Sequence, residues 1–276
     1  MKKFYSFIAP SGMKYLHIYL VMFFSIFIVF FLDSTMVSRV VPYSQWLANL
    51  VMLIAFCWML QQVTKKIKKL MLYGLIIGFV GESFFALVLG MYTYRLENLP
   101  LYVPIGHSIV YAGIFYVVKE PLFKKHQTAI CQVLYFAMIM YSTLWLFFAN
   151  DVFGFLCMLV ILFILNRHKD MKPFFLSMFF FVIYIELIGT YFQCWVWPDY
   201  WFNLFTFIPS ANPPSGIAAF YFIFDGACLL NYKAANPVVW HRLKRFQVRK
   251  GYIQIPYKEG LFGQIQNKLA RKLGRM

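Results

Sequence analysis

The stretch GESFFALVLGMYTYRLENLPLYVPIGHSIVY, residues 81–111, places Glu82 among phenylalanines, leucines and valines. A second glutamate, Glu186, has similarly apolar neighbours later in the chain. Ionisable residues within long apolar segments are costly and rare in membrane proteins, and they commonly mark functional sites. The two acids therefore predict a buried site, and the residues around them indicate the fold that holds it.

The composition indicates an all-α polytopic integral membrane protein. The 276 residues are 62% hydrophobic and only 13% charged, whereas a globular chain is about half apolar and about a quarter charged. The apolar residues form runs close to the length of about 20 residues that crosses a bilayer. The first run is too long for a cleaved signal peptide, so we expect it to be retained. Eight runs are expected to span the membrane, at about 15–32, 45–62, 70–92, 103–119, 128–147, 152–166, 174–194 and 214–232.

The distribution of Lys and Arg predicts the orientation of these helices. If the N-terminus is cytoplasmic, all but two of the 26 basic residues fall in cytoplasmic segments, and only Arg39 and Arg95 lie outside. Because cytoplasmic loops are enriched in Lys and Arg, we expect both termini in the cytoplasm and the protein in a bacterial inner membrane. The same asymmetry accounts for the net charge of +16, and we expect no nucleic-acid partner.

The last segment, residues 233–276, is predicted to be a basic amphipathic cytoplasmic tail. Helices with one apolar face and one basic face bind the surface of anionic leaflets. We therefore expect this tail to contact anionic headgroups of the inner leaflet. The apolar residues that recur at helical spacing in the tail are Val239, Leu243, Phe246, Leu261, Ile265 and Leu269.

A repeated motif surrounds the two glutamates. The segments PIGHSIVY (104–111) and PSGIAAFY (214–221) both fit the pattern P-x-G-x-x-x-x-Y. Each copy is preceded by one of the two glutamates and then by an aromatic-x-aromatic pair. The pairs are Tyr92 and Tyr94 in the first copy, and Trp195 and Trp197 in the second.

The repeated motif predicts two four-helix halves, residues 1–127 and 128–232, with the motif at 82–111 and at 186–221. Both copies have the same predicted direction through the membrane, so the halves are expected to be related by a pseudo-twofold axis along the membrane normal. The alternative is independent use of proline at the start of two helices, where its fixed φ angle is favourable.

Four ionisable residues in or near the apolar runs are the candidate catalytic residues. Two acids in one apolar site could transfer protons, and a histidine could act as a shuttle. The alternative is structural, with each acid neutral and hydrogen-bonded between helices, and the histidine anchored at the interface. Asp225 could pair with either glutamate or with a tyrosine. The candidates are Glu82, Glu186, His107 and Asp225.

Aromatic residues of the two motifs are the candidate substrate-binding residues. Their faces could stabilise a cationic intermediate, although an interfacial aromatic belt would also place such residues there. The candidates are Tyr92, Tyr94, Tyr111, Trp195, Trp197 and Tyr221. The segment SANPPSG (210–216) is expected to form a rigid lid over the outer mouth of the site.

The chain lacks the common signatures of metal and cofactor sites. Its cysteines and histidines have no metal-type spacing, and neither a Walker A loop nor a G-x-S-x-G elbow occurs. We therefore expect no metal and no cofactor. Gly74, Gly78 and Gly81 form a small-residue face, which predicts close packing of the helix that carries Glu82.

A glutamate followed by a glycine- and aromatic-rich Y-x-Y segment and a proline resembles the membrane-embedded carotenoid hydratases and the two-part lycopene cyclases. The resemblance covers residues 81–111 and 186–197, its spacing departs from that of these enzymes, and no catalytic residue is carried over from them. It implies an apolar, isoprenoid-like substrate and metal-independent acid/base chemistry of an isomerase, hydratase or cyclase type.

Three functions therefore remain open at the level of sequence. The first is binding or chemical modification of an apolar, lipid-like molecule by acid/base chemistry. The second is proton-coupled transport or export of a small lipophilic or cationic solute, with the acids carrying the proton. The third is a non-enzymatic membrane scaffold whose acids only hold helices together. Membrane lipids are expected partners in all three, and the oligomeric state is left open.

Overall fold

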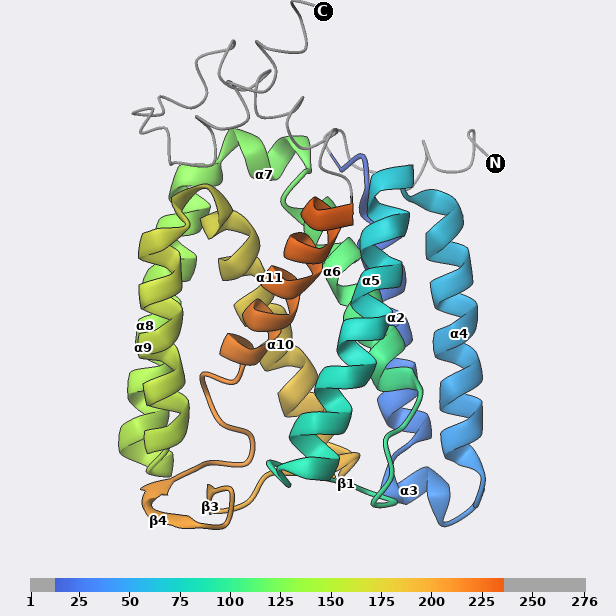
Figure 1. The fold of residues 1–276 in the computed structure, drawn as a ribbon, viewed down its shortest axis with the longest axis vertical. Helices are drawn as coiled ribbons and strands as arrows, with labels where there is room; N and C mark the ends of the chain where they lie inside the picture. The colour runs from blue at the N-terminus through green and yellow to red at the C-terminus, as the bar shows by residue number, and fades with distance from the viewer. Residues whose placement is uncertain (1–12, 236–276) are drawn as a thin grey trace, which may run out of the picture. The chain divides into compact units, whose positions relative to one another are not determined.

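The computed structural model describes residues 13–235 (Figure 1). Met1–Tyr232 forms one compact unit, and only the first residues of the second unit, Lys233–Met276, fall within the described range. The predicted amphipathic helices of the tail therefore lie outside the described residues. The fold below is that of the first unit.

Each of the eight apolar runs forms a helix within the described range. Four helical segments are long and apolar enough to cross a membrane, and four further apolar helices are shorter. The long ones are α4 (Ser44–Gln62), α5 (Lys65–Glu82) continued by the π-helix η1 (Ser83–Val88), α8 (Gln127–Ala149), and α10 (Lys172–Tyr191) preceded by the 3₁₀ turn η2 (Lys169–Met171). The shorter ones are α2 (Leu16–Leu32), α6 (Tyr102–Val117), α9 (Val152–Arg167) and α11 (Ala218–Ala235).

Many large apolar side chains on these helices point outward. Soluble monomers rarely expose such wide apolar surfaces, and apolar exteriors of this kind suit a lipid environment. The fold is thus an all-α arrangement with the apolar surface of a membrane protein. Examples, with the exposed fraction of each residue, are Phe24 (62%), Trp46 (66%), Ile76 (61%), Phe147 (77%) and Phe163 (61%).

Two predicted helix boundaries are wrong for local reasons. The third helix begins at Lys65 rather than near residue 70, because the long apolar stems of lysines allow the first turn to include them while the ammonium groups reach water. Its π-helical end stops at Val88, and Gly90 follows with a φ of 60°. A left-handed glycine is a common helix terminator, so Tyr92 lies beyond the helix rather than on it.

Consecutive helices run in alternating directions along the sequence (Figure 1). We call one end the basic end, where α5 starts with Lys65 and the short helix α7 (Pro121–Lys125) lies. The opposite end, which we call the hairpin end, carries the short helix α3 (Thr35–Ser38) and the strands β1 to β4. Helices α2, α4 and α6 pack against one another, as do α8 and α9, while α10 contacts α2, α6 and α8.

The glycine face of α5 packs closely on two helices, as the sequence predicts. A Cβ atom added at Gly78 would lie 3.3 Å from Cβ of His107 on α6. One added at Gly81 would lie 2.2 Å from Cε1 of Phe224 on α11. These glycines therefore bring the helix that carries Glu82 directly against α6 and α11.

Two short antiparallel strand pairs lie at the hairpin end. Strand β1 (Thr93–Tyr94) pairs with β2 (Trp195–Val196), with Thr93 opposite Val196 and Tyr94 opposite Trp195. Strand β3 (Tyr200–Trp201) pairs with β4 (Phe205–Pro209). The β1–β2 pair joins the segments that follow α5 and α10, which are about a hundred residues apart in the chain.

Candidate functional site

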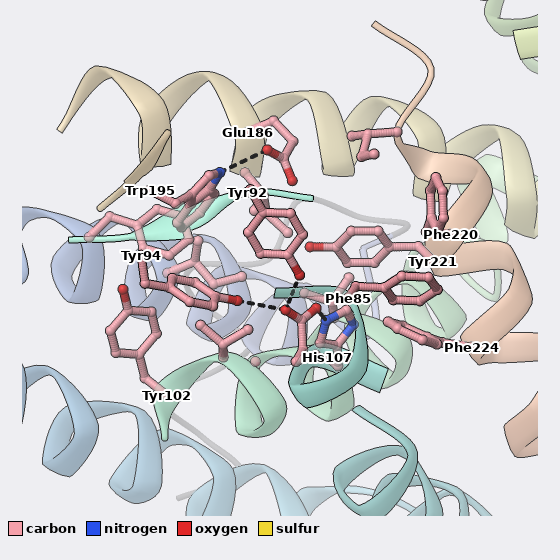
Figure 2. Close-up of a pocket in the computed structure, with 18 of the residues that line it drawn as sticks. Phe85, Tyr92, Tyr94, Tyr102, His107, Glu186, Trp195, Phe220, Tyr221 and Phe224 are labelled. Carbon is pink, nitrogen blue, oxygen red and sulfur yellow. Dashed lines mark hydrogen bonds and ion pairs between the residues drawn. The ribbon is translucent and has the colours of Figure 1, made fainter. Parts of the chain in front are cut away.

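The two glutamates line one cavity beneath the β1–β2 pair, and we call it the carboxyl chamber (Figure 2). Glu82 and Glu186 are each only 5% exposed. The free volume of the chamber is about 60 Å³, which is room for about two water molecules. Its lining comprises Glu82, Glu186, His107, Tyr92, Tyr94, Tyr102, Trp195, Trp197 and Tyr221, together with apolar residues that include Ile26, Phe30, Phe85, Val110, Ile185, Phe220 and Phe224.

Glu82 receives three hydrogen-bond donors. Oε2 accepts from the hydroxyls of Tyr92 and Tyr94, the latter at 2.6 Å, and Oε1 lies 2.6 Å from Nε2 of His107. Burial and, second, the charge of Glu82 raise the pKa of Tyr92 and of Tyr94 well above the usual value for tyrosine. Both hydroxyls therefore stay protonated and act as donors. A carboxylate with several donors and an imidazole beside it is a favourable place for a negative charge.

Glu186 has a different set of partners. Its Oε2 accepts from Nε1 of Trp195 and from Nε1 of Trp197, both at 3.0 Å. These indoles are neutral donors that cannot neutralise a charge. Among the described residues, Oε1 of Glu186 has no hydrogen-bond partner, and the side chain lines the chamber (Figure 2).

The β1–β2 pair brings together the donors of the two glutamates. Each glutamate is bound by the aromatic pair that follows it in its own half of the chain. The ring centroids of Tyr92 and Trp197 are 4.6 Å apart, and those of Tyr94 and Trp195 are 6.3 Å apart. The aromatic pairs, which the sequence predicts to bind substrate, donate hydrogen bonds to the two carboxyls.

Tyr221 of α11 and His107 of α6 pack against each other in the lining of the chamber. Their ring centroids are 4.6 Å apart, and His107 also contacts the ring of Phe224 at 5.2 Å. The Tyr221 hydroxyl points toward Tyr92 and Glu186 in Figure 2. It has no hydrogen-bond partner in the described part of the chain, so it is a second polar group available to a molecule in the chamber.

Asp225 and Tyr111 do not line the carboxyl chamber. Asp225 lies one helical turn beyond Tyr221 on α11, and its buried Oδ2 has no hydrogen-bond partner within residues 13–235. Oδ2 of Asp225 therefore makes none of the hydrogen bonds, to a glutamate or to a tyrosine, that the sequence left open. The ring of Tyr111 packs instead against Phe174 of α10, with centroids 5.4 Å apart.

A buried ion pair that the sequence does not predict anchors the chain directly after strand β1. Asp33, which is fully buried, pairs with Arg95, the residue after Tyr94. Oδ2 of Asp33 also accepts a hydrogen bond of 2.6 Å from the hydroxyl of Tyr102. Arg95 is one of only two basic residues predicted outside the cytoplasm. This rarity is the feature of the sequence that could have indicated a structural role for Arg95.

The segment expected to form a lid is tied to α9 and does not cover the chamber. Asp151 accepts a hydrogen bond of 3.0 Å from the amide of Gly154 at the start of α9. It also accepts from the amides of Ala211, at 3.1 Å, and Ser215, at 2.6 Å. The β1–β2 pair covers the chamber instead, because the chamber lining contains Tyr92, Tyr94 and their tryptophan partners but no residue between 198 and 216.

Comparisons of the chain with known protein families, with curated proteins and with solved structures find no match. A function is therefore inferred from the geometry of the carboxyl chamber.

Proposed function

We propose that this protein is a membrane-embedded acid/base catalyst that binds the end of an apolar, isoprenoid-like molecule in the carboxyl chamber. One observation carries the proposal: two buried carboxyl groups line a single aromatic chamber, and within residues 13–235 only Glu82 has a basic partner, His107. Apolar pockets with a few convergent polar groups are typical of small-molecule sites.

The unequal partners give the two glutamates different roles. Oε1 of Glu82 lies 2.6 Å from Nε2 of His107, and the hydroxyls of Tyr92 and Tyr94 donate to Oε2. A second negative charge at Glu186 would be buried beside it without a counter-charge, which is unfavourable in a region that excludes water. Glu186 is therefore the proton donor: Oε2 accepts from the indoles and Oε1 carries the proton into the chamber.

The arrangement supports a proton transfer to and from carbon. Glu186 would protonate one carbon of a double bond, and the resulting cation would lie against the faces of Tyr92 and Trp197. Loss of a proton from a neighbouring carbon to the Glu82–His107 pair gives an isomer. Addition of a chamber water, with its proton passed to the same pair, gives an alcohol. In both routes the proton lost by Glu186 is balanced by the one gained at Glu82–His107.

The size of the chamber limits what can react there. Its volume of about 60 Å³ admits water but not a whole isoprenoid. Only the end of a chain would enter, with displacement of side chains such as Phe220. The remainder of the molecule would lie elsewhere between the helices.

The proposed topology has all eight helices crossing the membrane, with the basic end in the cytoplasm. The alternating helix directions in Figure 1 support it, as does the excess of Lys at the basic end. The shorter helices, such as the 16 residues of α9, extend about 24 Å at 1.5 Å per residue. They fit a membrane if flanking residues complete the span. The carboxyl chamber then lies toward the outer leaflet.

The proposed internal repeat is supported by matching contacts in the two halves. Tyr94 and Trp195 are opposite each other in an antiparallel pair, as a local twofold axis would place them. Buried aspartates follow the first helix of each half, and each binds the segment before the fourth helix. Asp33 after α2 pairs with Arg95, and Asp151 after α8 accepts a hydrogen bond from the amide of Ser215. The Pro-x-Gly motifs differ, because Pro104 lies within α6 whereas Pro214 precedes α11.

A comparison of lipid extracts tests the proposed function. Membranes of a host that makes linear isoprenoids would be extracted with and without the protein and analysed by mass spectrometry. We expect an isoprenoid isomer or hydrate that appears with the wild type and is absent with Glu186→Gln. The matched control is Glu97→Gln, because Glu97 is exposed in the loop after β1 and should leave the product unchanged.

Two other outcomes would contradict the enzyme and identify another role. An unchanged lipid profile, together with solute-driven proton flux in proteoliposomes that Glu186→Gln abolishes, would indicate a transporter. An unchanged profile without flux, together with poor accumulation of both Glu82→Gln and Glu186→Gln, would indicate a scaffold.

A further inference from the structure

A second, larger cavity begins one helical turn from the carboxyl chamber on three helices. The chamber is lined by Ile26, Val110 and Ile185 of α2, α6 and α10. The neighbouring cavity is lined by Phe23, Ile114 and Phe181 of the same three helices. These positions are three or four residues apart on each helix, which is about one turn, and the direction is toward the basic end. We call this second cavity the tail groove.

The tail groove has the size and lining for an apolar chain. Its volume is about 390 Å³, and its walls are mostly aromatic and aliphatic side chains. Its one acid, Glu120, is engaged by the backbone amides of Lys14 and Tyr15. The Tyr184 hydroxyl donates to the carbonyl of Phe23 at 3.1 Å. Neither group therefore offers a free charge to a ligand headgroup.

An aromatic cluster lines the tail groove at the positions one turn from the carboxyl chamber. The ring centroid of Phe23 lies 4.8 Å from that of Phe181 and 5.3 Å from that of Tyr184. These side chains come from α2 and α10, which contact each other and also contact α6. The tail groove and the carboxyl chamber thus lie next to each other along the same faces of α2, α6 and α10.

We infer that the tail groove holds the distal part of the same apolar chain whose end enters the carboxyl chamber. The substrate is then an elongated linear isoprenoid that threads between α2, α6 and α10. On α6, His107 in the chamber and Val117 in the groove are ten residues apart, which is about 15 Å of helix. This inference rests on the proposed function, since it assumes that the chamber binds a chain end.

Photolabelling of the full-length protein in nanodiscs tests the inference. The probes are two geranylgeraniol derivatives, which carry a diazirine at one end or at the other, and a geraniol derivative that carries one diazirine. We expect one geranylgeraniol probe to label chamber residues and the other to label groove residues such as Phe181, whereas the geraniol probe should label only chamber residues. Unlabelled geranylgeraniol should compete with both geranylgeraniol probes, whereas short geraniol should compete only at the chamber.

Val117→Trp is the decisive variant, because Val117 is half-buried and lines the groove. Filling the groove should reduce geranylgeraniol labelling about tenfold, since contact with several methylene groups is lost, and leave geraniol labelling unchanged. The matched control is Val133→Trp, on the exposed side of α8. Leu122→Trp at the groove rim repeats the test if Val117→Trp accumulates poorly.

The outcomes separate this inference from the proposed function. Equal loss of geranylgeraniol and geraniol labelling in Val117→Trp, or groove labelling that only phospholipid competes away, would overturn the threaded chain while a Glu186-dependent lipid product still supported the enzyme. Labelling of both cavities without any Glu186-dependent product would keep the threaded chain as a binding mode and overturn the catalytic role.

Discussion

Tyr94 and Trp195 are opposite each other in the β1–β2 pair, and each donates a hydrogen bond to a different buried glutamate. Tyr94 binds Glu82 at 2.6 Å, and Trp195 binds Glu186 at 3.0 Å. The short strands β1 and β2 thus hold hydrogen-bond donors to both carboxyls at the hairpin end. Substitutions of the hydrogen-bond donors, of the two glutamates and of the Asp33–Arg95 ion pair should therefore have separate effects on the stability and the activity of the site.

Glu186→Gln should abolish activity without unfolding the protein. The amide carbonyl of glutamine can still accept from both indoles, so the packing of Trp195 and Trp197 is retained. The proton donor is lost, which should lower the rate by about 10²- to 10⁴-fold. Product formation and the thermal unfolding midpoint, measured on the same purified sample, check this. A midpoint that falls sharply would show that Glu186 is needed for folding instead.

Tyr94→Phe should destabilise the protein by removing one of the three donors to Glu82. A hydrogen bond to a charged group contributes about 1.5–3 kcal/mol, and the ring itself is retained. The control is Tyr43→Phe, because Tyr43 is 77% exposed and should change stability very little. Equal unfolding free energies for the two variants would contradict the role assigned to Tyr94.

The ion pair between Asp33 and Arg95 should behave as a buried unit. Asp33→Asn leaves Arg95 without its counter-charge, and breaking a buried pair costs about 3–5 kcal/mol. The double variant Asp33→Asn/Arg95→Gln should lose less than the sum of the single variants. Arg39→Gln, at an exposed position, is the control. Strict additivity in the cycle would mean that the two residues do not act together.

Gly81→Ala should destabilise the protein and displace Phe224, which lines the chamber. The added methyl group would meet the ring of Phe224 at 2.2 Å, and Phe224 contacts the ring of His107. Overpacking of this kind costs about 1–3 kcal/mol. Gly226→Ala is the matched control, because a Cβ there meets nothing within 4 Å. Alanine in a helix is favoured over glycine by about 1 kcal/mol, so the control should be neutral or slightly stabilising.

The helices and part of the site could be predicted from the sequence because they depend on local patterns. Apolar runs identify helices, and all eight runs form them. The pairing of Glu82 with Tyr92 and Tyr94, and of Glu186 with Trp195 and Trp197, follows the order of residues in the repeated motif. The hydropathy pattern gives the depth of a residue along the helix but not the direction in which its side chain points.

The remaining parts of the site depend on contacts between distant segments. Strands of two residues show no alternation of apolar and polar residues, so the β1–β2 pair could not be found. Asp33 and Arg95 are far apart in the chain, and no periodic pattern links them. Asp225 was placed with the glutamates by its depth alone, and one turn of α11 separates it from the chamber.

Deuterium transfer from solvent to carbon tests the central claim most directly. Proteoliposomes that contain geranylgeraniol would be incubated in D₂O, and the extracted isoprenoid would be analysed by mass spectrometry for deuterium at carbon. The proposed role of Glu186 as proton donor predicts incorporation with the wild type and with Glu97→Gln, and loss of incorporation with Glu186→Gln. Equal incorporation in Glu186→Gln and the wild type would contradict that role.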